Sequence, residues 1–123
     1  MLEKIDTTYK CIKVMAVVTP TDLYQTCADV GAQVIVPKNS IENAAYRNVN
    51  PGLIILIGIT DVEEEGVWKN VNNGSPVSWT HFATNEGNRI EPAVFMRSDG
   101  WWLDAAGGTG STLCEKQPFN RCE

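Results

Sequence analysis

The chain has 123 residues, of which 43% are hydrophobic and 20% are charged, and this composition is typical of one globular domain rather than of a disordered segment. Its formal net charge of −5 argues against a nucleic-acid partner, because binding to phosphates requires a basic surface. The longest apolar stretch, residues 53–59, is too short to cross a bilayer. We therefore interpret residues 1–123 as a single domain that neither binds nucleic acid nor spans a membrane.

Four cysteines near the two ends of the chain indicate a disulfide framework: Cys11, Cys27, Cys114 and Cys122. No two of them have C-x-x-C spacing, which argues against a zinc site or a thioredoxin-like motif. An even number of cysteines suits an oxidising compartment, so we interpret the chain as the mature form of a secreted, extracellular protein. Four cysteines can form two disulfides in three ways, and the sequence alone does not choose among them. A bridge between the two ends would stabilise the fold by roughly 4–5 kcal/mol in the chain-entropy model.

The first predicted elements are a strand and a helix. Residues 9–18 are rich in β-forming side chains and predict the strand. The helix is expected to begin at Thr19, which can act as its cap, with Asp22 at the acidic position of a capping box. Cys27 lies on the apolar face of this helix, and Gly31 is expected to end it.

A second helix is predicted after a short strand. The strand covers residues 34–36 and stops at Pro37. Asn39 and Glu42 bracket the start of the second helix, and the Asn-Pro-Gly sequence at residues 50–52 ends it.

The second half of the chain predicts strands around a long loop. Residues 53–60 predict a strand, the pattern loosens after Trp68, and residues 80–90 are polar with little periodicity. A loop of this length in a compact domain is typically functional. A hairpin is expected over residues 94–102, and a last strand over residues 112–115.

Aromatic residues and the single histidine were considered as functional groups. The four tryptophans are Trp68, Trp79, Trp101 and Trp102. Aromatic residues at strand ends form the core more often than a sugar-stacking platform, so we expect most of them, and Trp102 above all, in the core. His81 has no neighbouring Cys or Ser motif, which favours a loop side chain over a catalytic base. A glycosidase needs a paired acid and nucleophile, and only the number of acids supports one, so we predict that the chain is not an enzyme.

Four residues with oxygen donors occupy the polar loop and the strand that follows it: Glu86, Asn88, Glu91 and Asp104. Carboxylate and amide oxygens are the ligands that calcium prefers. Glu86 and Asn88 are two residues apart, so in an extended segment their side chains can point the same way. Unpaired carboxylates held together would repel one another, and either a bound Ca²⁺ or protonation of one carboxylate would relieve this repulsion. The alternative interpretation is a solvated acidic loop.

A series of motifs, in this order and at these spacings, resembles the C-type lectin-like domain family and, within it, the mannose-binding collectin type. The resemblance covers residues 9–115 and implies an α+β fold, with two helices, a distorted antiparallel sheet and a long calcium- and ligand-binding loop. The matching segments are 56–61 (LIGITD, similar to W-I-G-L-T-D), 65–68 (EGVW), 74–80 (GSPVSWT), 86–88 (EGN, in place of Glu-Pro-Asn), 102–104 (WLD, in place of Trp-Asn-Asp) and 114–116 (CEK).

The resemblance implies calcium-dependent binding of sugars. In the family, residues at the positions of Glu86, Asn88, Glu91 and Asp104 hold a Ca²⁺, and two sugar hydroxyls bind to this ion. The order Glu-x-Asn at residues 86–88 goes with equatorial 3- and 4-hydroxyls, so we expect mannose-type glycans on cell surfaces or glycoproteins. Asp61 and Glu65 could still serve in a weaker second calcium site, but we expect at most one bound calcium. A shallow site for one sugar binds weakly, so useful binding would need several domains acting together, as in a homo-oligomer.

Two departures from the family pattern keep a second hypothesis open. Leu103 stands where the family has a ligating Asn, and Gly87 replaces a cis-proline. The alternative is therefore a calcium-independent module of the same fold that binds a protein or another surface ligand. The resemblance also implies two disulfides, Cys27–Cys114 and Cys11–Cys122.

Overall fold

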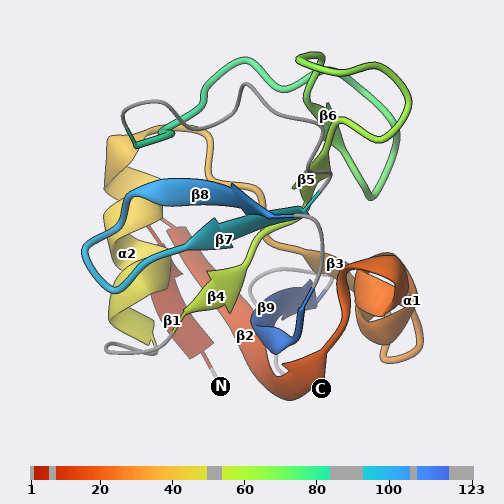
Figure 1. Cartoon of the computed structure of the whole chain (residues 1–123). Coiled ribbons are helices and arrows are strands. Elements are labelled where there is room, and N and C mark those ends of the chain that lie inside the picture. Colours follow the sequence, from red (N-terminus) through yellow and green to blue (C-terminus); the bar gives the residue numbers. More distant parts are fainter. Residues whose placement is uncertain (1, 6–7, 50–53, 84–92, 106–107, 117–123) are drawn as a thin grey trace.

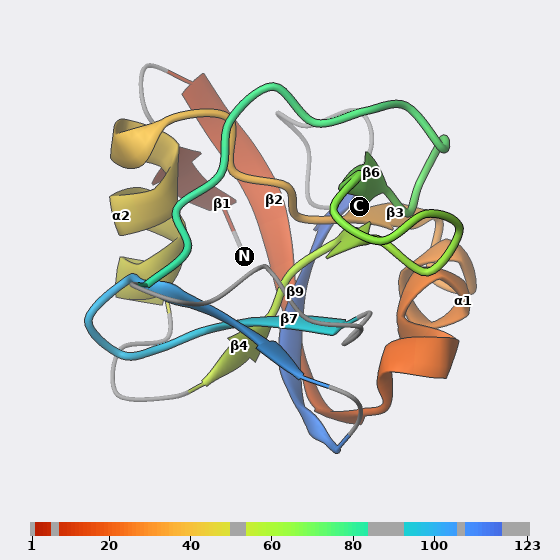
Figure 2. The same cartoon turned by 45° about the horizontal axis from the view of Figure 1, so that its top comes forward.

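In the computed structural model, two helices lie on opposite sides of a mixed sheet (Figures 1 and 2). The structure describes residues 2–5, 8–49, 54–83, 93–105 and 108–116. Within these ranges, neither helix is long and apolar enough to cross a bilayer.

Among the described residues, the large sheet has seven strands, and β9 is its centre. β9 pairs with β2 along one edge, and with β3 and β4 along the other, and the β4–β9 pair is parallel. The sheet predicted to be antiparallel is therefore mixed. Its order is β1-β2-β9-β4-β7-β8, with β3 beside β9. The strands are β1 (Leu2–Ile5), β2 (Thr8–Val18), β3 (Ala32–Val34), β4 (Ile55–Leu56), β7 (Ala93–Met96), β8 (Trp102–Ala105) and β9 (Gly110–Lys116).

The stretch that was expected as one strand over residues 53–60 contains two strands in different sheets. β4 belongs to the large sheet, whereas β5 (Ile59–Thr60) pairs with β6 (Lys69–Asn70) in a small one. The chain crosses β3 between them, at Gly58, whose amide donates to the Ile35 carbonyl (2.9 Å). A Cβ on Gly58 would lie 2.9 Å from the Val34 Cβ, so only glycine allows this close crossing.

The first helix begins differently from the prediction. A 3₁₀ turn, η1 (Pro20–Asp22), precedes α1 (Leu23–Ala28). The Thr19 hydroxyl donates to the Asp22 carboxylate (3.0 Å) and caps no backbone amide, so the expected Thr19 cap is wrong. Gly31, with a φ of +72°, ends the helical segment as predicted.

The second helix, α2 (Ser40–Val49), begins where the sequence predicts. The Asn39 side chain accepts a hydrogen bond from the Glu42 amide (2.8 Å), and the Glu42 carboxylate accepts one from the Lys38 amide (3.0 Å). Two amides at the helix start are thus satisfied by side chains.

The core has two parts, and one of them contains a disulfide. The larger part packs Trp102 and Tyr46 with apolar side chains of the sheet. The smaller part contains Cys27 and Cys114, whose disulfide is confirmed. Cys11 is also disulfide-bonded, but Cys122 lies outside the described residues, so the Cys11–Cys122 pairing stays a prediction.

The tryptophans divide between core and surface. Trp102 is fully buried and Trp68 is 8% exposed, as expected of core residues. Trp79 is half-buried and packs against the core. Most of the tryptophans thus lie in the core, as predicted. Trp101 is the exception: it is 42% exposed and follows the turn of the β7–β8 hairpin, where its ring lies against His81.

Candidate functional site

Asp104 is the one residue of the predicted calcium site that the structure describes, and it lies on β8. Glu86, Asn88 and Glu91 lie outside the described residues. Side chains alternate along β8, so Trp102 and Asp104 are buried whereas Leu103 is half-buried. Asp104 is 6% exposed and pairs in register with Val94 of β7. Asp104 places a carboxylate, an oxygen donor of the type that calcium takes, at this position of β8, and this makes it a candidate ligand.

The chain on both sides of residues 84–92 is attached to β8. On one side, the Ala83 amide donates to the Trp102 carbonyl (3.0 Å). On the other side, Ala93 pairs with Ala105. A strand rises about 3.3 Å per residue, so these two attachment points on β8 are about 10 Å apart. Asp104 lies between them along the strand.

Leu103 is the residue at which β8 departs from the Trp-Asn-Asp motif of the family that the sequence resembles. It pairs with Phe95 of β7, and its apolar side chain has no oxygen to offer a cation or a sugar hydroxyl. At these two positions, β8 therefore offers the Asp104 carboxylate but no amide side chain.

The residues of the weaker predicted site, Asp61 and Glu65, lie in one turn after β5. Asp61 is buried, and its carboxylate accepts a hydrogen bond from the Gly66 amide (3.1 Å), which closes the turn. Glu65 is exposed. In the described parts of the chain, no three His, Cys, Asp or Glu side chains come together as a metal site would require.

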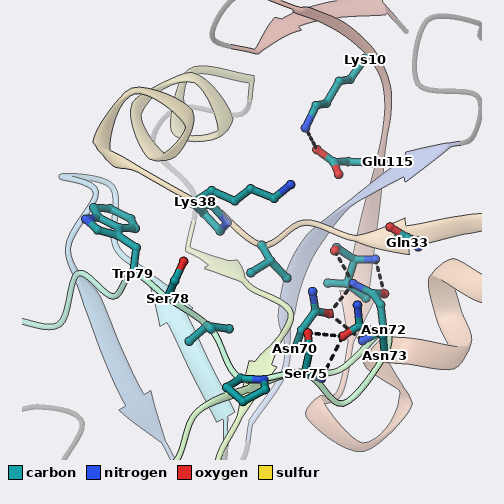
Figure 3. Close-up of a pocket in the computed structure, with 15 residues that line it drawn as sticks. Lys10, Gln33, Lys38, Asn70, Asn72, Asn73, Ser75, Ser78, Trp79 and Glu115 are labelled. Carbon is teal, nitrogen blue, oxygen red and sulfur yellow. Dashed lines mark hydrogen bonds and ion pairs between the residues drawn. The ribbon is translucent and has the colours of Figure 1, made fainter.

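A polar pocket, which the sequence did not predict, lies between the residues that follow β3 and the loop that follows β6 (Figure 3). Its volume is about 320 Å³. Lys10 of β2 and Glu115 of β9 are among its lining residues, and their Nζ and Oε1 atoms are 3.1 Å apart. The Tyr46 hydroxyl of α2 also donates to Glu115. Burial raises the pKa of Glu115, and the Lys10 ammonium partly opposes this effect. The cluster of asparagines at residues 70–73 was the sequence signal closest to this pocket.

Near this pocket, aromatic rings form a row that leads from the core to the surface. Trp79 packs edge-on against buried Trp102, with ring centres 5.5 Å apart. The His81 ring stacks on Trp79 (5.3 Å) and on Trp101 (3.9 Å). His81 is thus a loop side chain as predicted, and its place between two indoles gives it a packing role.

Comparison with known proteins defines the fold. No family model matches the sequence. The structure is similar to the mouse scavenger receptor C-type lectin carbohydrate-recognition domain, with a TM-score of 0.77 and 21% identity over 89% of this chain and 91% of that one. The cow C-type carbohydrate-recognition domain of CD23 has a TM-score of 0.76 and 19% identity, again over 89% and 91%. A calcium-independent type II antifreeze protein has a TM-score of 0.76 and 18% identity over 87% and 85%.

These similarities confirm that the chain has the C-type lectin-like fold, as the motifs predicted. Two of the three proteins are named as carbohydrate-recognition domains, and none is named as an enzyme. The third is named as calcium-independent.

Proposed function

We propose that the chain is a carbohydrate-binding domain that recognises mannose-type glycans through a Ca²⁺ held by Glu86, Asn88, Glu91 and Asp104. The observation that carries this proposal is the buried Asp104 carboxylate, with the chain on both sides of residues 84–92 attached to β8 around it. The similarity to two carbohydrate-recognition domains supports it, and the cow CD23 domain was solved in the presence of a GlcNAc2Man3 oligosaccharide.

The donor set fits a hard cation. Three carboxylates and one amide oxygen are the types of ligand that calcium takes, and the ion would offset the repulsion among the carboxylates. Bound Ca²⁺ would supply coordination positions for two neighbouring sugar hydroxyls. The carboxylates would accept hydrogen bonds from those hydroxyls, and the Asn88 amide would donate one. The order Glu-x-Asn favours equatorial hydroxyls, as in mannose.

The second candidate is a calcium-independent module that binds a protein or another surface ligand. Leu103 favours it, because this apolar residue, paired with Phe95, stands where the motif has an amide. The similarity to a calcium-independent antifreeze protein shows that the fold also exists without this requirement.

Thermal unfolding separates the two candidates. Midpoints are measured in calcium, in EDTA, and in calcium with excess methyl α-mannoside. A ligand that binds only the native state adds about 2.7 kcal/mol of stability at a hundred times its Kd. We expect calcium to raise the midpoint of the wild type and the mannoside to raise it further. If the wild type does not respond to calcium, the first candidate is wrong and the second is favoured.

Two variants test whether the response of the midpoint to calcium comes from the site that contains Asp104. Asp104→Asn keeps the shape of the buried side chain but removes its charge, so we expect it to abolish the response to calcium. Asp29→Asn makes the same change at an exposed position and should retain the response. Far-UV circular dichroism checks that both variants are folded.

We further propose that the protein is secreted and acts as a homo-oligomer. The Cys27–Cys114 bridge and the bonded state of Cys11 suit an oxidising, extracellular environment. Several weak sites acting together would raise the avidity for a glycan surface. Light scattering of the purified protein would show a single mass of one chain if the oligomer proposal is wrong.

A further inference from the structure

We propose that the polar pocket after β3 and β6 is a second saccharide site, which binds a neutral sugar without calcium. None of the described residues that line it belongs to β7 or β8, so it is separate from Asp104. This inference does not rest on the proposed calcium site.

The two sides of the pocket are fixed to each other. One side is formed by residues 33–38 and the other by residues 70–79 (Figure 3). Asn72 joins them, because its Oδ1 accepts from the Val34 amide and its Nδ2 donates to the Val34 carbonyl, both at 2.9 Å. The same Nδ2 also donates to Asn70 Oδ1 (2.9 Å). A pocket held open in this way needs little ordering when a ligand binds.

Several polar groups of the lining remain for a ligand. The Oδ1 atoms of Asn70 and Asn73 accept hydrogen bonds from the loop backbone, and no described residue accepts from their Nδ2 groups. Gln33 and Lys38, on the opposite side, are exposed and add an amide and an ammonium group. Donors and acceptors therefore face the same space.

The chemistry of this lining favours a neutral saccharide. A polyhydroxylated ligand both donates and accepts hydrogen bonds, which matches the mixed set of groups. Trp79 adds an aromatic surface for the apolar C–H face of a sugar ring, and its packing on Trp102 holds it in place. The charges of Lys10 and Glu115 largely cancel because the two groups form an ion pair, so hydrogen bonds rather than charge dominate the lining. The volume of about 320 Å³ lies within the range of pockets for small ligands.

The test is a titration of the ¹⁵N-labelled protein in EDTA, followed by two-dimensional NMR, with maltose, lactose and N,N′-diacetylchitobiose as probes. We expect at least one of them to shift the Trp79 indole and the Asn70 and Asn73 side-chain signals saturably. The double variant Gln33→Ala/Lys38→Ala, which changes only exposed side chains, should weaken this binding about fivefold or more through lost hydrogen bonds. Lys13→Ala removes an exposed lysine outside the pocket and should leave the affinity unchanged.

Three results would overturn the proposal. The first is the absence of a saturable shift with all three sugars at millimolar concentrations. The second is binding that the double variant leaves unchanged. The third is binding of a sulfated disaccharide when the neutral sugars do not bind. Asp104→Asn should retain the shifts in EDTA, so failure of the calcium site and failure of the pocket are distinguishable.

Discussion

The two helices are attached to the sheet in different ways. α1 has six residues, buries Leu23 and Cys27 in an apolar part of the core, and is joined covalently to β9 through Cys114. α2 has ten residues, and its buried side chains, Asn43 and Tyr46, are polar or carry a hydroxyl. The two helices lie on opposite sides of the sheet (Figure 2).

The hydrogen bonds of α2 reach both candidate sites. Asn43 donates to the Gly100 carbonyl and accepts from the Trp102 indole, both at 2.8 Å, and Trp102 is two residues before Asp104 on β8. Tyr46 donates to Glu115 in the wall of the polar pocket. A covalent bond thus secures the α1 side of the fold, whereas buried hydrogen bonds of α2 position the strands that carry the sites.

Removal of the Cys27–Cys114 disulfide should have the largest effect on the free energy of unfolding. The double variant Cys27→Ala/Cys114→Ala opens a loop with a sequence separation of 87 residues. We expect a loss of roughly 4–5 kcal/mol in the free energy of unfolding, because the unfolded chain gains entropy. Urea denaturation measures this loss. A loss below about 1 kcal/mol would show that packing alone secures α1.

Asn43→Ala tests the attachment of α2. It removes two buried hydrogen bonds and leaves the Trp102 indole N–H and the Gly100 carbonyl without their partner, so we expect a loss of about 2–4 kcal/mol. Asn48→Ala, at an exposed position of the same helix, is the matched control and should change the stability by less than about 0.5 kcal/mol. Equal losses in the two variants would contradict the proposed role of Asn43.

Glu115→Gln tests how the buried Glu115 carboxyl, which Tyr46 of α2 contacts, makes the free energy of unfolding depend on pH. Because burial raises the pKa of Glu115 above its ordinary value of 4.5, the native state holds this proton more tightly than the unfolded state. The resulting stabilisation is fully present below pH 4.5 and is lost as the pH rises through the folded-state pKa. We therefore expect the stability of the wild type relative to Glu115→Gln to fall over this interval, measured by urea denaturation at several pH values. A difference that does not depend on pH would refute this expectation.

The smallest changes in stability are expected from substitutions at the two helix starts. Asn39→Ala removes a side-chain cap of α2 and should cost about 1 kcal/mol. Thr19→Ala removes a hydroxyl whose partners among the described residues are exposed side chains, Thr21 and Asp22, and should change the stability by less than about 0.5 kcal/mol. Urea denaturation of both variants measures the difference. If Thr19→Ala costs as much as Asn39→Ala, the hydroxyl has a capping role that the structure does not show.

Local signals predicted the elements well, and contacts between distant residues account for most errors. The β7–β8 hairpin and the start of α2 depend on residues a few positions apart, so their patterns were visible in the sequence. The division of residues 53–60 was not visible, because it depends on the crossing of Gly58 over β3, more than twenty residues earlier. The stacking of Trp101 against His81 was likewise not visible, because the two residues are twenty positions apart.

The sequence by itself determined the class of fold, the positions of the helices and the β7–β8 hairpin, and, through its motifs, the Cys27–Cys114 pairing and Asp104 as a candidate ligand. The helices and the hairpin follow from local propensity and from the spacing of a few residues, whereas the pairing and the candidate ligand are implied by the resemblance to the C-type lectin-like family. The tertiary structure alone decided that β9 is central, that α2 binds the hairpin through Asn43, and that the polar pocket exists. The pocket joins Lys10, Asn72 and Glu115, which are far apart in the chain, and only packing of the whole domain brings such residues together.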